Sequence, residues 1–324
     1  MDFSKMAIGE IASLPVFANF EYLIGEENPA MAPMVNAATI ESVCQMIPVW
    51  DSASLTEGIE YLYERAQEKQ ILFDIYDEDG KTPENAATGI ACFTVPGDEK
   101  VPYVVILAGG SYRHCCKIQE GFPVAKRLNE MGIAAFVVQY RTGKVFEFDG
   151  AMEDVAQGIR FIRENADELN VNPDDYAVMG YSAGGHIAAL WGTNHLGFKA
   201  HDLPAPGALL LGYPVVTLEP LSHYKEKLTD IAVKDWSPEA MSYCSVMEHA
   251  DADYPRTFVF AFEDDNTVPK PASGKVLCDY LDKAGIENVC QLFPGELHGT
   301  GLSDHTIAKG WLNDAVDFWR KPLV

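Results

Sequence analysis

The sequence predicts an α/β fold in which helices cover both faces of a mostly parallel central sheet and a small cap is added. Short, uninterrupted apolar segments such as residues 101–109 and 133–140 are typical of strands buried on both faces. Amphipathic segments suited to helices separate these strands along the chain. With 324 residues, 48% of them hydrophobic, the chain is long enough to bury the core that such a fold needs.

The expected elements follow a regular order. Residues 54–70 place apolar side chains at helical spacing. Residues 71–79 and 88–96 predict two pairing strands joined by a turn. Further on, strands are expected at 101–109, 133–140, 175–182, 207–214, 256–263 and 289–295, and helices at 121–132, 150–169, 183–192, 275–285 and 307–319.

Two segments lie outside this alternation. Residues 1–70 form an N-terminal extension that precedes the α/β domain of residues 71–324. Within that domain, about forty residues without strand character separate two strands, and so long a connection is usually functional. We therefore expect residues 215–254 to be a cap insertion over the site, with the N-terminal extension as a candidate second wall.

Composition and charge limit the classes of partner that this chain is expected to bind. The formal net charge is −24, and so acidic a surface disfavours nucleic acid. No segment of about 18 apolar residues predicts a membrane span, and the first residues do not resemble a secretory signal. Seven cysteines without metal-type spacing favour reduced thiols. The expectations are a cytoplasmic location and no nucleic-acid or membrane partner, with a homo-oligomer left possible.

A G-x-S-x-G pattern, residues 180–184, supplies the candidate nucleophile. It stands where a strand ends and a helix begins, as a nucleophile elbow requires. The flanking residues must be very small in so tight a turn. Ser182 is therefore the predicted nucleophile, whereas His186, four residues further along the same helix, is expected to be structural.

The oxyanion hole is expected from two segments. One N–H should come from Ala183, the residue after the nucleophile. The other should come from the glycine-containing loop after strand 101–109, where Gly110 and Ser111 occupy the donor positions and Gly109 permits the turn.

The acid and the base are expected after later strands, in the chain order serine, acid, histidine. Three consecutive acids, Glu263, Asp264 and Asp265, lie at the end of strand 256–263, and the D-x-x-V-P spacing selects Asp265, with Asp264 as the alternative. His298 follows the last strand and is the predicted base, oriented by the acid. His305 is the competitor and is interpreted as part of a helix start.

The runs GGSY, EGFPVAKRLNEMGIAAFVVQYR, VMGYSAGGHIAALWGT, FEDDNTVP and FPGELHGTGL resemble bacterial carboxylesterases of the α/β-hydrolase fold. The similarity is to the branch that contains acetyl esterases and proteins like acetyl-xylan esterases and feruloyl esterases, and it covers about residue 71 to the C-terminus. It implies Ser182, Asp265 and His298 as a triad, and the Gly110/Ser111 loop with Ala183 as the oxyanion hole. Ser111 departs from the third glycine of that family's loop.

We therefore expect a serine hydrolase that cleaves short-chain acyl esters of a sugar or another small molecule. Acetyl esters are the leading candidates. The alternatives are a peptidase or amidase of the same fold and a catalytically inactive binding protein. No cofactor and no metal are expected. Candidate substrate-binding side chains are those of Tyr112, Cys115, Tyr181 and Tyr213.

Overall fold

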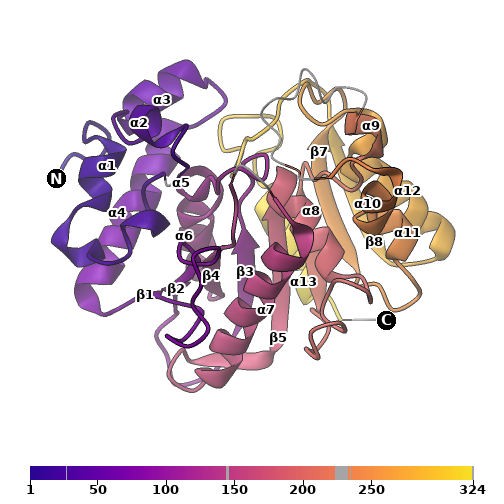
Figure 1. Ribbon diagram of the computed structural model, residues 1–324, viewed down its shortest axis with the longest axis horizontal. Coiled ribbons are helices and arrows are strands. Elements are labelled where there is room, and N and C mark those ends of the chain that lie inside the picture. Colours follow the sequence, from indigo (N-terminus) through magenta and orange to yellow (C-terminus); the bar gives the residue numbers. More distant parts are fainter. Residues whose placement is uncertain (27, 144–145, 223–232, 234, 323–324) are drawn as a thin grey trace.

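The computed structural model describes residues 1–26, 28–143, 146–222, 233 and 235–322. A sheet of eight strands, counted over these residues, forms the centre of the molecule in the order β1-β2-β4-β3-β5-β6-β7-β8 (Figure 1). The strands are β1 (Leu72–Phe73), β2 (Gly89–Phe93), β3 (Val101–Leu107), β4 (Ala134–Gln139), β5 (Val171–Tyr181), β6 (Ala208–Gly212), β7 (Thr257–Phe262) and β8 (Asn288–Phe293).

The pairing is parallel over most of the sheet. Strands β3 to β8 run parallel to one another, whereas β2 is antiparallel to both β1 and β4. Parallel strands require crossover connections, and helices supply them. The predicted class is therefore confirmed, because the sheet is mostly parallel and its strands alternate with helices.

Helices pack on both faces of this sheet. The helices are α1 (Ile8–Ala12), α2 (Ala32–Val35), α3 (Ile40–Met46), α4 (Ser52–Glu68), α5 (Lys117–Glu120), α6 (Phe122–Glu130), α7 (Phe148–Glu164), α8 (Ser182–Trp191), α9 (Glu219–Ser222), α10 (Pro238–Tyr243), α11 (Val246–His249), α12 (Gly274–Ala284) and α13 (Trp311–Arg320), with short 3₁₀ turns at Pro15–Phe17, Glu21–Leu23 and Lys270–Ala272. One cluster of buried hydrophobic side chains is formed by α7, α8 and α12 together with one face of the sheet. A second is formed by α4, α6 and α13 together with the other face. Alternate residues of β3 belong to opposite clusters: Val105 to the first, Val104 and Ile106 to the second.

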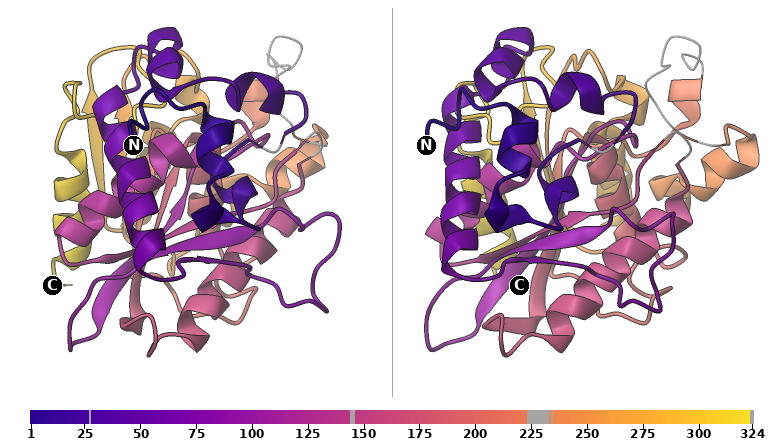
Figure 2. Two further views of the ribbon diagram at one scale, coloured as in Figure 1. Left: turned by 90° about the vertical axis from the view of Figure 1, so that its left-hand side faces the viewer. Right: turned by 60° about the vertical axis from the view of Figure 1, so that its left-hand side comes forward.

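The N-terminal helices cover the β1–β2 side of the molecule (Figures 1 and 2). Helix α4 lies so close to α6 that a Cβ on Gly58 would stand 2.7 Å from Pro123. Leu55, Ile59 and Leu62 of α4 are buried in the same cluster as α6. Residues 1–70 thus share the core of the α/β domain rather than forming a separate unit.

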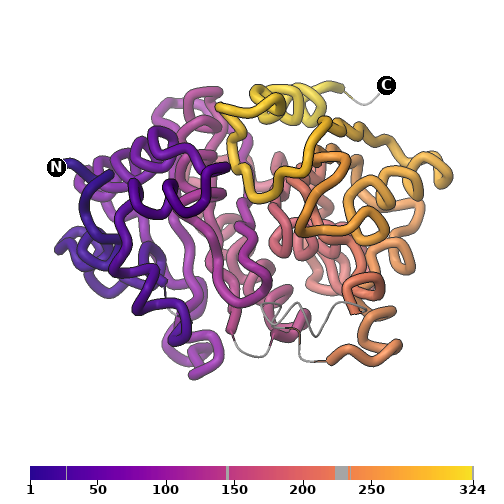
Figure 3. Tube along the Cα trace, turned by 90° about the horizontal axis from the view of Figure 1, so that it is seen from above, coloured from indigo at the N-terminus to yellow at the C-terminus, as the bar shows by residue number. Residues whose placement is uncertain are grey.

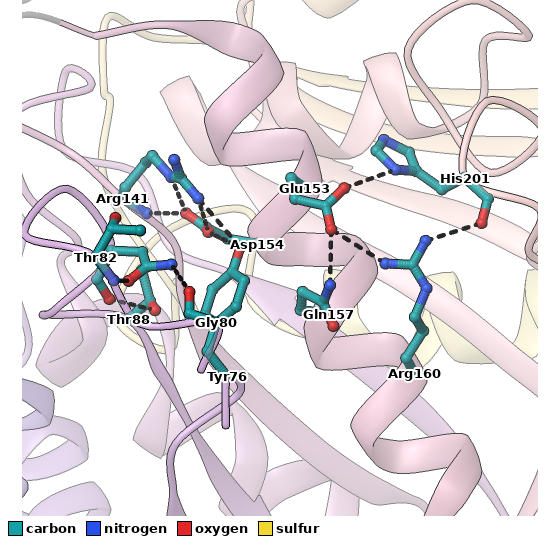
Figure 4. A network of polar contacts seen from close by, with 11 residues as sticks. Tyr76, Gly80, Thr82, Thr88, Arg141, Glu153, Asp154, Gln157, Arg160 and His201 are labelled. Carbon is teal, nitrogen blue, oxygen red and sulfur yellow. Dashed lines mark hydrogen bonds and ion pairs between the residues drawn. The ribbon is translucent and has the colours of Figure 1, made fainter. Parts of the chain in front are cut away.

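A buried carboxylate joins α7 to the end of β4 (Figure 4). The side chain of Asp154 is fully buried and accepts hydrogen bonds from the Arg141 backbone N–H at 2.6 Å and its guanidinium at 2.7 and 2.9 Å. The Tyr76 hydroxyl donates a further bond of 2.6 Å. Because a buried charge needs such partners, this network fixes α7 against the chain that follows β1 and β4.

Two expectations from the sequence need correction, and a third lies partly outside the described residues. The strand expected at 71–79 is limited to Leu72–Phe73, because the chain then leaves the sheet edge and brings Tyr76 to α7. His305 lies exposed in turns before α13, which begins at Trp311, so it does not start a helix. The expected cap insertion, 215–254, contains α9, α10 and α11, but residues 223–232 and 234 lie outside the described residues.

Candidate active site

Ser182 occupies the tight turn between β5 and α8. Its φ is 51°, a left-handed backbone that serine rarely adopts and that marks local strain. A Cβ on Gly180 would stand 2.3 Å from the Gly184 carbonyl oxygen, and one on Gly184 would stand 2.3 Å from that of Leu107. Both flanking positions therefore require glycine, which explains the small residues of the sequence pattern.

An imidazole and a carboxylate form a hydrogen-bonded chain with this serine. The His298 Nε2 lies 2.8 Å from the Ser182 Oγ, and the His298 Nδ1 lies 2.7 Å from the Asp265 Oδ2. The Asp265 side chain is 5% exposed, and its Oδ1 accepts hydrogen bonds from the backbone N–H groups of Thr267 and Val268 at 2.8 and 2.9 Å. With its carboxylate fixed in this way, Asp265 can hold His298 with the proton on Nδ1 and Nε2 free to accept the serine proton.

The two alternative residues lie elsewhere. Asp264 points away from the imidazole and forms an exposed ion pair of 2.9 Å with Lys270. His305 is exposed, and its neighbour Asp304 forms an ion pair of 2.8 Å with Arg127. Of the two candidate acids, only Asp265 contacts His298.

The loop after β3 presents backbone donors beside the serine. A Cβ on Gly109 would stand 2.9 Å from the Ser182 Cβ, so the loop touches Ser182. Gly110 and Ser111 both have positive φ, 141° and 55°. The N–H groups of Gly110, Ser111 and Ala183 donate to no other group within the described part of the chain, which leaves them able to bind an oxyanion.

A buried glutamate that sequence reasoning missed supports this loop from behind. The Glu120 Oε2 accepts a hydrogen bond of 2.6 Å from the Gly109 N–H, and its Oε1 accepts one of 2.7 Å from the Tyr213 hydroxyl. The Tyr213 oxygen in turn accepts a bond of 2.9 Å from the Gly301 N–H, on the loop that carries His298. Burial raises the pKa of Glu120. Glu120 begins one of the runs that resemble the esterase family, but that resemblance gives it no role, so only the tertiary structure reveals its place behind the loop.

The substrate-binding role expected for the three tyrosines requires correction, because each side chain is at most 1% exposed. Tyr112 donates a hydrogen bond of 2.8 Å to the His186 Nδ1, inside the core. Tyr181 packs edge-on against Trp311 on the far side of the turn. Tyr213 contacts the His298 ring, with 4.8 Å between ring centres, and its hydroxyl is already engaged. These three tyrosines thus support the site from within the core and are not exposed to a substrate.

His186 belongs to the core, as expected. Its Nε2 donates a 2.7 Å hydrogen bond to the Cys244 carbonyl oxygen, while its Nδ1 accepts from Tyr112. Burial lowers the pKa of His186 to about 4, so the ring is neutral near pH 7.

Cys115, the fourth expected residue, lines an apolar cavity of about 330 Å³. One wall is the N-terminal segment, including Met31, Val35 and Trp50, and the other is the chain from His114 to Gln119. This volume lies within the range of small-molecule binding pockets. The N-terminal extension is expected from the sequence as a candidate second wall, but its lining residues could not be named, because residues 1–70 carry no motif.

A polar cluster, Glu26–His114–Cys116, lies at one side of this cavity. The His114 Nδ1 is 2.8 Å from the Glu26 Oε2, and its Nε2 is 3.8 Å from the Cys116 Sγ. Burial lowers the pKa of His114, but the nearby Cys116 sulfur and the Glu26 carboxylate outweigh burial and raise that pKa to about 10. Burial likewise opposes the charge on Glu26, yet His114 lowers its pKa overall. The two side chains therefore form an ion pair near pH 7.

No helix in the described residues is both long and apolar enough to cross a membrane. In the same part of the chain, no group of three or more His, Cys, Asp or Glu side chains could hold a metal ion.

Comparison with known proteins finds sequence similarity to xylan-degrading enzymes and esterases. The family described as BD-FAE matches residues 94–202. The chain is 28% identical over 216 residues to the acetylxylan esterase of Xylanibacter ruminicola and 26% identical over 223 residues to endo-1,4-beta-xylanase B of Butyrivibrio fibrisolvens. Each alignment covers 66% of this chain, but only 44% and 35% of the respective relative. The chain thus spans less than half the length of these curated relatives.

Solved structures show the same fold. The acetyl ester-xyloside bifunctional hydrolase of Caldicellulosiruptor lactoaceticus superimposes with a TM-score of 0.66 at 25% identity, over 76% of this chain and 94% of that one. The Thermogutta terrifontis esterase Est2 superimposes with a TM-score of 0.59 at 22% identity, over 76% of this chain and 92% of that one, a likeness of fold alone. The predicted α/β-hydrolase fold and the resemblance to bacterial carboxylesterases are confirmed.

Proposed function

We propose that this chain, a relative of carboxylesterases with the α/β-hydrolase fold, hydrolyses carboxylic esters with Ser182 as nucleophile, His298 as general base and Asp265 as the orienting acid. The single observation that carries the proposal is the hydrogen-bonded chain Ser182–His298–Asp265, with its distances of 2.8 and 2.7 Å. Such a chain, beside free backbone donors, is the arrangement that acyl transfer needs.

The reaction would proceed in two steps. The Ser182 Oγ attacks the ester carbonyl while His298 takes its proton, and the N–H groups of Gly110, Ser111 and Ala183 stabilise the oxyanion. The bond to the alcohol then breaks, and His298 returns the proton to the departing alcohol. Water, activated by the same imidazole, hydrolyses the acyl-enzyme and releases the acid.

The acyl group of the substrate is expected to be short, and acetyl is the leading candidate. The supporting observation is the likeness to an acetylxylan esterase and to an acetyl ester-xyloside hydrolase. A sugar or another small molecule would supply the alcohol.

Turnover of p-nitrophenyl acetate tests the proposal. Ser182→Ala is expected to lower kcat/KM by at least about 10³-fold, because the covalent step is removed. Ser13→Ala, at an exposed serine whose Oγ only donates to the Gly9 carbonyl oxygen, is the matched control and should retain full activity. A fluorophosphonate probe should label the wild type and the control but not Ser182→Ala. Equal turnover by Ser182→Ala would reject the proposal.

Aminoacyl anilides, assayed beside the acyl esters, separate an esterase from a peptidase or amidase. Faster cleavage of the anilides would contradict the ester assignment. An unlabelled, inactive wild type would instead indicate a binding protein.

A further inference from the structure

We infer that the apolar cavity between the N-terminal segment and residues 114–119 is a substrate subsite that binds an apolar group of the ester, aliphatic or aromatic and larger than acetyl. The inference rests on the proposed function and deepens it. It implies that the physiological substrate is a small apolar ester rather than an acetylated polysaccharide.

Two residues that line the cavity contact the loops that carry the proposed catalytic machinery. On the oxyanion side, His114 lines the cavity and packs under Gly110, where a Cβ would stand 2.6 Å from the imidazole Cδ2. On the histidine side, Gln119 also lines the cavity and donates a hydrogen bond of 3.2 Å to the Gly299 carbonyl oxygen, next to His298. A group bound in the cavity is therefore close to an ester held at Ser182.

Trp50 connects the N-terminal segment to the same place. Its indole lines the cavity, and a Cβ on Gly299 would stand 3.8 Å from the Trp50 Nε1. From above, the loop after β8, which carries His298, lies between the purple elements of the first half of the chain and the orange elements of the second (Figure 3). The cavity wall and the histidine loop are thus direct neighbours.

The chemistry of the lining indicates the ligand class. Methionine and branched aliphatic side chains dominate the wall, including Met31, Met34, Val35, Val43 and Met46. Flexible, polarisable methionines adapt to apolar groups of varied shape. Met34 and Met46 are each 62% exposed, and together they form an apolar rim that water solvates poorly. A sugar, with hydroxyl groups that each require a partner, would bind badly here.

The N-terminal segment is fixed in place, so the cavity is preformed. The Glu26–His114 ion pair joins the two walls at 2.8 Å. Beside it, the Asn28 side-chain amide donates a hydrogen bond of 3.1 Å to the Arg113 carbonyl oxygen. A preformed cavity binds its ligand without an added cost of ordering the wall.

Two substrate series identify which part of the ester, the acyl group or the alcohol, binds in the cavity. One varies the acyl chain of p-nitrophenyl esters from acetyl to decanoyl, and the other varies the alcohol of acetate esters from methyl to octyl and 1-naphthyl. In one of the two series, kcat/KM should rise by roughly threefold per added methylene until the cavity is full. A rise in the first series assigns the cavity to the acyl group, and a rise in the second assigns it to the alcohol.

A pair of neighbouring alanines provides matched variants. Ala38 lines the cavity, whereas Ala37 is exposed and lies outside it. Ala38→Trp fills the cavity and should lower kcat/KM at least tenfold for the longest substrates of the series that shows the rise, with the shortest substrate of that series changed less than twofold. Ala37→Trp should leave the whole profile unchanged. Ala38→Leu fills less of the cavity and should shorten the preferred substrate chain by a few carbons. It keeps the test available if Ala38→Trp does not fold.

The possible failures are distinguishable. If the wild type prefers acetyl esters of small alcohols or acetylated xylan over every longer substrate, or if Ala38→Trp and Ala37→Trp give the same profile, the subsite is rejected while the esterase proposal stands. If Ser182→Ala turns over as fast as the wild type, the proposed function itself fails.

Discussion

The Glu120 carboxylate accepts a 2.6 Å hydrogen bond from the Gly109 N–H, directly behind the residues that present the oxyanion donors. Its second oxygen accepts from Tyr213, which is bonded to the histidine loop. One buried side chain therefore holds two of the loops that meet at Ser182. The hydrogen bonds of Glu120 go to Gly109 and Tyr213 and not to Ser182, His298 or Asp265, so we predict that Glu120 is a positioning residue.

Glu120→Gln tests this role. An amide can accept only one of the two hydrogen bonds, so one loop should lose its anchor and kcat should fall about tenfold or more, with KM changed less than twofold. Glu130→Gln, on the exposed surface of α6, is the control and should retain kcat. Steady-state kinetics well below the melting temperature would measure both, and an unchanged kcat in Glu120→Gln would show that the carboxylate is only structural.

Two adjacent aspartates allow a matched test of the acid. Asp265→Asn should lower kcat by about 10³- to 10⁴-fold, because the amide no longer stabilises the imidazolium or fixes its tautomer. Asp264→Asn removes only an exposed ion pair with Lys270 and should stay within twofold of the wild type. The reverse ranking in a p-nitrophenyl acetate assay would reassign the acid.

The Glu26–His114 pair predicts how stability depends on pH. The pKa of His114 is raised to about 10, so its contribution is complete below the unfolded value near 6.5 and is lost as the pH rises toward 10. The pKa of Glu26 is lowered, so its contribution is complete above about 4.5 and is lost on acidification. The pair should therefore stabilise the fold most between about pH 4.5 and 6.5.

Denaturant unfolding of the wild type and Glu26→Gln across pH 3 to 10 measures this contribution. The difference in the free energy of unfolding should peak in that window and shrink on both sides. Glu10→Gln, at an exposed position of α1, supplies the control. A difference that is constant with pH would contradict the ion pair.

Asp154 and Glu153, neighbours on α7, compare a buried with an exposed carboxylate (Figure 4). Asp154→Asn leaves the Arg141 guanidinium without its buried counter-charge and should lower the free energy of unfolding by about 3 kcal/mol. Glu153 is 39% exposed, and Glu153→Gln should cost less than about 1 kcal/mol. Urea denaturation checks both values, and similar losses in the two variants would contradict the role of burial.

The sequence predicts the sheet well because buried parallel strands are continuous apolar segments. The expected strands 101–109 and 133–140 correspond to β3 (Val101–Leu107) and β4 (Ala134–Gln139). The predicted edge strand, residues 71–79, was too long, because the sequence pattern alone cannot show where a chain leaves the sheet. Tyr76 leaves it to reach Asp154, a contact made across 78 positions.

The three side chains of the proposed triad were predicted from the sequence and lie together in the structure, whereas their surroundings could not be predicted. Ser182 and His298 lie in motifs whose backbone geometry restricts the sequence, as the close contacts of Gly180 and Gly184 show. The pocket depends on which face of an element meets which neighbour. Tyr112 and Tyr181 therefore proved to be core residues, while Trp50 and Ala38, from a segment without motifs, line the cavity.

The left-handed backbone of Ser182 has a consequence for the evolution and engineering of this chain. Glycine at position 182 would relieve roughly 1 kcal/mol of steric strain, since it lacks the Cβ that opposes φ = 51°. The residue that suits the fold best is therefore not the one that can attack an ester. A screen that selects thermostable variants without measuring turnover would enrich inactive ones at this codon.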